Sequence, residues 1–250
     1  MKDLTVIIPI SELKDEAEIG MLQKAIDSAG DNNIIVVGPK SELDKISNDN
    51  VKKLVNKSDN VTYQHQVNMA VDEVNTKYFS VLEFDDYFSP KWFDNVEKYI
   101  EYDTEDISCF LPLTEIVDFK ENKIIGYSNE PFWASSFSEE VGYPDMESMT
   151  NYLNFNTSGA VFKKDDFVAL GQLKESMKLV FWYEYLLRSL YNNKRLYVIP
   201  KVGYYHVVNR DGSLSAYYGE TISEKEANWL VDLAKKEYYF KKDRNKVYEE

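Results

Sequence analysis

The first half of the sequence alternates short runs of β-branched residues with helical patterns, and this alternation constrains the fold more than any other feature. The apolar runs that predict buried strands are 4–10 (LTVIIPI), 33–38 (NIIVVG), 51–56 (VKKLVN) and 78–84 (YFSVLEF). Apolar residues recur at helical spacing in 17–30 and in 63–77, which lie between these runs. Strands and helices in this order predict an α/β fold, with a mostly parallel central sheet flanked by helices.

The second half is less regular, but no linker, repeat or low-complexity tract separates it from the first. We therefore expect one domain over residues 1–250, with a long loop at 128–150 and a C-terminal helix over 223–250. The segments expected to be strands are 106–119, 123–127, 158–164, 195–200 and 203–208, and the segment expected to be a helix is 177–193.

Acidic residues outnumber basic ones by 43 to 29, which leaves a formal net charge of −14. Such a field opposes binding to nucleic acid and to anionic membranes, although the basic segment 235–246 leaves a nucleic-acid acceptor open. The single cysteine, Cys109, excludes an intrachain disulfide and a cysteine-rich zinc site. No apolar run reaches the roughly 20 residues of a membrane span, and the N-terminal residues lack a signal-peptide pattern, so we expect a cytoplasmic protein.

Three carboxylates, Glu83, Asp85 and Asp86, directly follow the apolar part of the fourth predicted strand, in the segment 81–90 (VLEFDDYFSP). Like charges this close together repel one another, and parallel sheets bind ligands beyond the carboxyl ends of their strands. The cluster therefore indicates a cation site, with a solvated turn or the N-cap of a following helix as the alternative. Carboxylate oxygens at a strand end suit Mg²⁺ or Mn²⁺.

The run 66–93 (QVNMAVDEVNTKYFSVLEFDDYFSPKWF) resembles the central stretch of family 2 glycosyltransferases. In that family, a helix with an asparagine leads into a strand that ends in an Asp-x-Asp-Asp motif; Asn68 and Tyr78 are in register, and residues 83–86 fall on the acidic motif. The first two predicted strands resemble the start of the GT-A fold, and 158–176 (SGAVFKKDDFVALGQLKES) resembles the family's later Gly-x-x-Phe segment. The resemblance covers roughly residues 4–215.

The resemblance implies a GT-A fold (nucleotide-diphospho-sugar transferase-like) in which residues 1–105 bind the nucleotide-sugar and residues 106–222 form the acceptor-side, catalytic half. It implies an enzyme that moves a sugar from a nucleotide-diphosphate donor, first of all a UDP-sugar, to a hydroxyl acceptor with inversion. The leaving diphosphate is anionic and the protein is acidic, so the reaction needs a bound cation. Mn²⁺ or Mg²⁺ held by carboxylates supplies that charge as a Lewis acid.

By position in the resemblance, Asp85 is the expected direct metal ligand and His206 a second candidate from late in the chain. Glu83 is expected to meet the ribose or the ion's water shell, and Asp86 the metal or the sugar. Further donor contacts are expected from Pro9, Ser41, Asn68, Trp182, Arg210 and Ser213. A structural, hydrogen-bonded role remains the alternative for His206, as does a core role for Trp182.

The sequence departs from the family at the acidic motif and after the second strand. Glu83 replaces the usual first aspartate of the motif. Residues 38–41 (GPKS) replace the acidic run that meets the nucleotide base in the family, and Ser41 or Lys40 is expected to take over that contact.

The third departure concerns the catalytic base. Inverting members carry Glu-Asp at the start of a helix with an arginine several residues later; with Arg188 aligned to that arginine, Phe181 and Trp182 occupy the Glu-Asp positions. Glu184 is the only carboxylate on this stretch. We predict Glu184 as the general base for the acceptor hydroxyl, and an ordinary i,i+4 ion pair with Arg188 is the alternative.

Other classes of function remain open. A degenerate GT-A protein that binds a sugar-nucleotide or a partner without turnover fits the altered motif. A sugar-phosphate nucleotidyltransferase needs a glycine-rich basic loop after the first strand, but residues 9–20 (PISELKDEAEIG) are acidic and contain no glycine before Gly20. A haloacid-dehalogenase-type phosphotransferase would carry its aspartate pair after the first strand rather than the fourth.

Overall fold

The computed structural model describes residues 1–247, of which 214, 215 and 239–247 are described by their backbone alone. The strands are β1 (Leu4–Pro9), β2 (Asn33–Gly38), β3 (Val51–Val55), β4 (Tyr78–Val81), β5 (Tyr87–Phe88), β6 (Ile107–Asp118), β7 (Lys123–Ser128), β8 (Val161–Lys163) and β9 (Arg195–Val208). The helices are α1 (Glu16–Ser28), α2 (Lys40–Leu43), α3 (Tyr63–Asp72), α4 (Trp92–Glu101), the 3₁₀ turn η1 (Glu130–Trp133), α5 (Met146–Asn151), α6 (Lys164–Ala169), α7 (Phe181–Tyr191), α8 (Leu214–Thr221) and α9 (Glu224–Val247).

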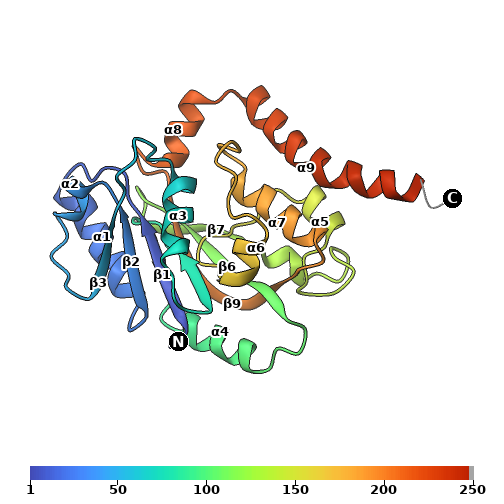
Figure 1. Cartoon of the computed structure of the whole chain (residues 1–250), viewed down its shortest axis with the longest axis horizontal. Coiled ribbons are helices and arrows are strands. Elements are labelled where there is room, and N and C mark those ends of the chain that lie inside the picture. The colour runs from blue at the N-terminus through green and yellow to red at the C-terminus, as the bar shows by residue number, and fades with distance from the viewer. Residues whose placement is uncertain (248–250) are drawn as a thin grey trace.

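Within residues 1–247, nine strands form one sheet in the order β3-β2-β1-β4-β8-β6-β9-β5, with β7 paired to β6 outside this path. β1 pairs in parallel with β2 and β4, β2 with β3, and β6 with β9. β8 is antiparallel to both of its neighbours and joins the two parallel parts. The expected neighbourhood of the first, second and fourth strands is confirmed, and the architecture is the predicted mostly parallel α/β sheet (Figure 1).

Each face of the sheet is covered by a separate apolar core, as the strand pattern predicts. Along β1, Val6 and Ile8 pack with the side of α1 that carries Leu22 and Ile26. Ile7, which points to the opposite face, belongs with the core that includes α3 and α7. Because side chains alternate along a strand, an apolar residue at every position of β1 is what burial on both faces requires.

The ends of α1 follow ordinary capping rules. Asp15 is the N-cap, and its Oδ1 accepts a hydrogen bond from the Glu18 backbone N–H at 3.0 Å. Gly30 follows with φ 60°, the left-handed conformation in which helices commonly end.

The second half differs from the sequence prediction in several elements. The two strands expected at 195–200 and 203–208 are one long strand, β9, whose pairing with β6 has register shifts. The expected loop 128–150 contains η1 and the start of α5. The helix expected from 177 begins at Phe181, and the helix α8 was not expected at all. The C-terminal helix expected over 223–250 is present as α9, and residues 248–250 lie outside the described part.

Helix α9 passes alongside α7 and then extends beyond the rest of the molecule, at the right of the view in Figure 1. Its buried residues Leu230, Ala234 and Tyr238 join the core that contains α7. The first part of α9 is therefore an integral part of the wall of the molecule on the side of α7.

Candidate functional site

The acidic segment begins just after β4, at the carboxyl end of the parallel strands. β4 ends at Val81, three residues earlier than expected, so Glu83 lies in the loop beyond the strand. The Glu83 backbone N–H donates to the hydroxyl of buried Tyr204 on β9 at 3.1 Å. The Tyr204 ring leaves no room for a side chain at Gly159, whose added Cβ would lie 2.3 Å from it with φ at 74°. Three distant segments are thus fixed against one another at this point.

Glu83, Asp86 and His206 converge beside this loop. Their potential ligand atoms all lie within 4.8 Å of one another. The Asp86 carboxylate is buried, accepts a hydrogen bond from the Val207 N–H at 2.7 Å and lies 2.9 Å from Nδ1 of His206. The Ser158 hydroxyl donates to Oε1 of Glu83 at 3.0 Å. The sequence reasoning had placed all three of the converging residues in the donor or metal site.

Burial and mutual repulsion strongly perturb the charges of this group. Burial raises the pKa of the Glu83 carboxyl to about 7, and the Asp86 charge adds to the increase. Burial acts in the opposite direction on His206, but the charge and hydrogen bond of Asp86 outweigh it and raise the pKa of the imidazole to about 9. Without a metal ion, the site therefore holds a protonated His206 at neutral pH, while the Glu83 carboxyl is about half protonated.

The donor set fits a divalent cation. Two carboxylates and one imidazole offer oxygen and nitrogen ligands, which suit Mn²⁺ and, through the oxygens, Mg²⁺. The elevated pKa values mean that the site already attracts positive charge, which protons supply when no ion is bound. Glu83, Asp86 and His206 are thus the residues of the described chain that would hold the metal.

We expect the imidazole of His206 to titrate near pH 9 in the presence of a chelator, because the Asp86 carboxylate stabilises the imidazolium. The chain has only two histidines, so a His65→Gln background leaves the ring signals of His206 alone in a proton NMR titration. Asp86→Asn should move the midpoint downward. Since a cation at this site must displace the proton, Mn²⁺ affinity should increase as the pH rises towards 9. A midpoint near the ordinary value for histidine would contradict this assignment.

Asp85 points to a different partner from Asp86. Its Oδ2 accepts a hydrogen bond from Nε of Arg210 at 2.7 Å, while Nη1 of Arg210 donates to Oε1 of Glu18 on α1, also at 2.7 Å. Arg210 is buried and its guanidinium lies over the ring of Phe84. Asp85 is thus ion-paired with Arg210 through Oδ2 and is not part of the group formed by Glu83, Asp86 and His206. Its direct metal contact stays a prediction.

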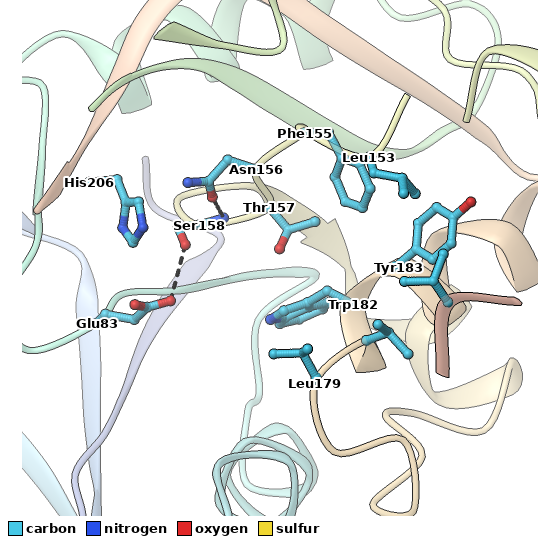
Figure 2. Close-up of a pocket in the computed structure, with 12 residues that line it drawn as sticks. Glu83, Leu153, Phe155, Asn156, Thr157, Ser158, Leu179, Trp182, Tyr183 and His206 are labelled. Atoms are coloured by element: carbon cyan, nitrogen blue, oxygen red, sulfur yellow. Dashed lines mark hydrogen bonds between the residues drawn. The ribbon is translucent and has the colours of Figure 1, made fainter. Parts of the chain in front are cut away.

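A pocket of about 320 Å³ opens beside this candidate metal group and includes two of its members, Glu83 and His206. Figure 2 shows Glu83, His206 and Ser158 at one end of this pocket and Leu153, Phe155 and Tyr183 at the other. The lining residues are Glu83, Leu153, Phe155, Asn156, Thr157, Ser158, Leu179, Val180, Trp182, Tyr183, His206 and Val231. The pocket thus has a polar end next to the candidate metal ligands and an apolar end away from them.

Trp182 lies between the two ends of the pocket (Figure 2). Its ring stacks on Phe162 with centroids 4.9 Å apart and planes inclined by 10°. It therefore lines the pocket and packs on the core at once, and its contact with the donor sugar stays a prediction.

The structure corrects the expectation for Glu184. Its side chain has no exposed surface and does not line the pocket. Nη2 of Arg188 lies 2.9 Å from its Oε2, Nζ of Lys174 lies 2.8 Å from its Oε1, and the Tyr238 hydroxyl donates to Oε1 as well. A carboxylate without exposed surface, enclosed by two cations and a phenol, has no access to an acceptor hydroxyl. The ion pair with Arg188, the alternative from the sequence, is what the structure contains.

The remaining predicted contacts lie outside the pocket. Pro9 is buried at the end of β1, and Ser41 is exposed in α2 with its hydroxyl bonded to Glu42. The side-chain amide of Asn68 forms two hydrogen bonds with the backbone of Leu173: its Oδ1 accepts from the N–H at 3.0 Å, and its Nδ2 donates to the carbonyl at 2.8 Å. Ser213 caps α8 through the Ala216 N–H. These four contacts to the nucleotide-sugar stay predictions.

Sequence reasoning missed the loop before β8 and the partner of Arg210. Asn156, Thr157 and Ser158 line the pocket, and Glu18 neutralises Arg210 from α1. A cluster of small polar residues before Gly159 was a visible signal for the loop. Glu18 gave no signal, because an acidic residue in the first turn of a helix is ordinary.

No protein-family model matches the chain, and no curated protein matches its sequence significantly. Solved structures do match its fold. The TarS 1–349 fragment from S. aureus, a GT-A glycosyltransferase, matches in its complex with UDP-GlcNAc with a TM-score of 0.62 and 13% identity over 86% of this chain and 61% of that one. The chain has the GT-A glycosyltransferase fold.

A second GT-A neighbour is the mannosyltransferase PcManGT from Pyrobaculum calidifontis in complex with GDP-Man and Mn²⁺. It matches with a TM-score of 0.60 and 13% identity, over 84% of this chain and 58% of the neighbour. The matched part of the chain spans about three fifths of each of these two neighbours. Across residues 1–247 of this GT-A chain, no helix combines the length and the apolar character needed to cross a membrane.

Proposed function

We propose that the chain is a metal-dependent glycosyltransferase that moves a sugar from a nucleotide-diphosphate donor, first of all a UDP-sugar, to a hydroxyl acceptor. The observation that carries this proposal is the convergence of Glu83, Asp86 and His206 at the end of β4, beside a pocket with an aromatic wall. The GT-A neighbours, solved with UDP, UDP-GlcNAc and GDP-Man with Mn²⁺, support a nucleotide-sugar as donor.

In this proposal the two halves of the chain bind different substrates. Residues 1–105 would hold the nucleotide across the ends of β1 and β2, where Pro9 and Ser41 lie, and residues 106–222 would face the acceptor. A bound Mn²⁺ or Mg²⁺ would offset the charge of the leaving diphosphate. Opening of the Asp85–Arg210 pair would give Arg210 a second role, as a cation for the same phosphates.

The chain's own residues would orient the sugar. The Ser158 hydroxyl fixes the Glu83 carboxylate, and the N–H of Val207 fixes that of Asp86, so both present defined oxygens to the site. The Trp182 ring offers an apolar face for a sugar ring, and its stack on Phe162 holds it in place. With these groups held in advance, binding costs little reorganisation.

A sugar-nucleotide-binding protein without turnover is the second candidate. The observation in its favour is that Glu83 is the only carboxylate among the described lining residues, and Glu83 belongs to the candidate metal group. Inverting transfer needs a base for the acceptor hydroxyl, and Glu184 is enclosed.

The test is a screen of nucleotide diphosphates and nucleotide-sugars with Mn²⁺, Mg²⁺ or chelator. We expect UDP to bind at least tenfold more tightly with Mn²⁺ than with chelator, because the carboxylates alone repel phosphate. Donor hydrolysis or transfer in the same screen would establish the enzyme. Metal-dependent binding with no turnover across donors and acceptors would favour the binding protein, and equal affinities with metal and with chelator would refute the metal-dependent site.

A further inference from the structure

The apolar end of the pocket has no task in the proposed reaction with the donor. Glu83, His206 and Ser158 mark the end where sugar and diphosphate would meet, and Trp182 forms the middle (Figure 2). We infer that this apolar end binds an apolar group, aryl or alkyl, that the acceptor carries next to its reacting hydroxyl. The inference rests on the proposed function for the identity of the acceptor, but not for the existence of the binding site.

The apolar end is open to solvent and yet made of large apolar side chains. Leu153 is 50% exposed and Leu179 37% exposed, and both line the pocket. Val231 of α9 also lines the pocket. Isolated exposed leucines are common on protein surfaces, but these two line a single concave site, where a ligand removes their surface from water.

This end is preformed by contacts with the rest of the protein. The rings of Phe155 and Tyr183 lie 5.6 Å apart, inclined by 32°. The Tyr183 hydroxyl donates to the Met149 carbonyl at 3.0 Å, so its polar atom is satisfied by the backbone. Val231 is held in place by α9, whose Tyr238 bonds to buried Glu184. A rigid apolar wall binds an apolar group with little loss of conformational freedom.

The charges at the pocket favour an uncharged acceptor. The twelve lining residues in the described part of the chain include one carboxylate and one histidine, but no lysine or arginine. Away from His206 and the candidate metal group, a phosphate or carboxylate on the acceptor would therefore meet no cationic side chain among these residues, within a protein of net charge −14. The reacting hydroxyl must lie at the polar end, so the rest of a small acceptor extends towards Leu153 and Leu179.

The test compares methyl, phenyl and octyl β-glucopyranosides, which share one sugar and differ only in the apolar group. Their binding is measured by calorimetry with UDP and Mn²⁺ present. We expect the better of the phenyl and octyl compounds to bind the wild type at least about tenfold more tightly than the methyl compound, the usual effect of burying a group of that size. The ranking of phenyl against octyl then identifies the apolar group as aromatic or aliphatic.

The matched variants change leucines of similar exposure. In the double variant Leu153→Ser/Leu179→Ser, the preference over the methyl compound should fall below about threefold, and in Leu153→Ser alone it should fall in part. Leu233→Ser is the control, because Leu233 is 41% exposed on α9 and does not line the pocket. It should keep the full preference.

Equal binding of the three glucosides by the wild type, no binding of any of them, or a preference that survives in the double variant would overturn the inference. Binding of UDP with Mn²⁺, measured alone, separates this result from the proposed function. If UDP binds but the glucosides show no preference for an apolar group, the glycosyltransferase proposal stands and the inference of an apolar acceptor is wrong. If the preference depends on the two leucines but UDP does not bind, the apolar binding site is supported and the proposal of a nucleotide-diphosphate donor is wrong.

Discussion

Asp86→Asn should abolish the metal-dependent part of nucleotide-diphosphate binding and lower any sugar transfer by roughly 10² to 10⁴. Asp86 contributes the buried carboxylate of the candidate metal group and pairs with His206. The loss corresponds to the several kcal/mol that a bound cation contributes to the stabilisation of developing negative charge. Asparagine keeps the shape of the side chain and an oxygen for the Val207 N–H, so the fold should remain intact. Calorimetry with UDP, with Mn²⁺ or with chelator, measures the effect.

The matched control is Asp85→Asn, one residue away in the same loop. Asp85 is ion-paired with Arg210, which keeps its second partner Glu18 in the variant. We therefore expect Asp85→Asn to keep the dependence of UDP binding on Mn²⁺, with the affinity changed by less than about tenfold. The reverse result, with metal dependence lost in Asp85→Asn and kept in Asp86→Asn, would restore the direct ligand role that the sequence resemblance gives to Asp85.

The fold of the first half could be predicted because each local pattern agrees with the global structure. β1 is buried at every position, and α1 has its apolar stripe and the following Gly30 where the pattern predicts them, with Asp15 as its N-cap. The second half lacks this agreement. The single strand β9 contains Pro200 and Gly203, which read as an interruption in the sequence, and only its pairing with β6 keeps it continuous.

The site could be predicted only in part, because sequence position does not fix side-chain partners. Asp86 of the acidic motif and His206 are 120 residues apart in the sequence. The position of each in the resemblance to family 2 glycosyltransferases was sufficient to propose both for the site. Which of two adjacent aspartates faces the histidine depends on the loop after Val81, where the strand ends earlier than its apolar run. The enclosure of Glu184 depends on Tyr238 of α9 and on Lys174 of the segment between α6 and α7, and no local pattern relates either of them to α7.

Glu184→Gln should lower the free energy of unfolding by about 3–5 kcal/mol, the usual cost of breaking a buried ion pair on one side. Glu184 has no exposed surface, and the change leaves the Arg188 guanidinium, itself only 8% exposed, without its carboxylate. For a chain of this size the loss corresponds to a melting temperature lower by roughly 6–20 °C. UDP binding and any transfer, measured well below the transition, should stay within about twofold of the wild type, because the residue lies outside the pocket.

Asp44→Asn provides the matched comparison, because Asp44 forms an i,i+4 ion pair with Lys40 that is exposed on both sides. The free energy of unfolding of that variant should fall by less than about 1 kcal/mol. Both variants remove an i,i+4 pair, so the difference between their losses is the effect of burying the pair. A Glu184→Gln protein that melts like the wild type but has lost transfer by 10²-fold or more would return Glu184 to the role of catalytic base. The opposite outcome, a large loss of stability with transfer retained, assigns Glu184 to the attachment of α9 and thereby to the integrity of the pocket wall that Val231 completes.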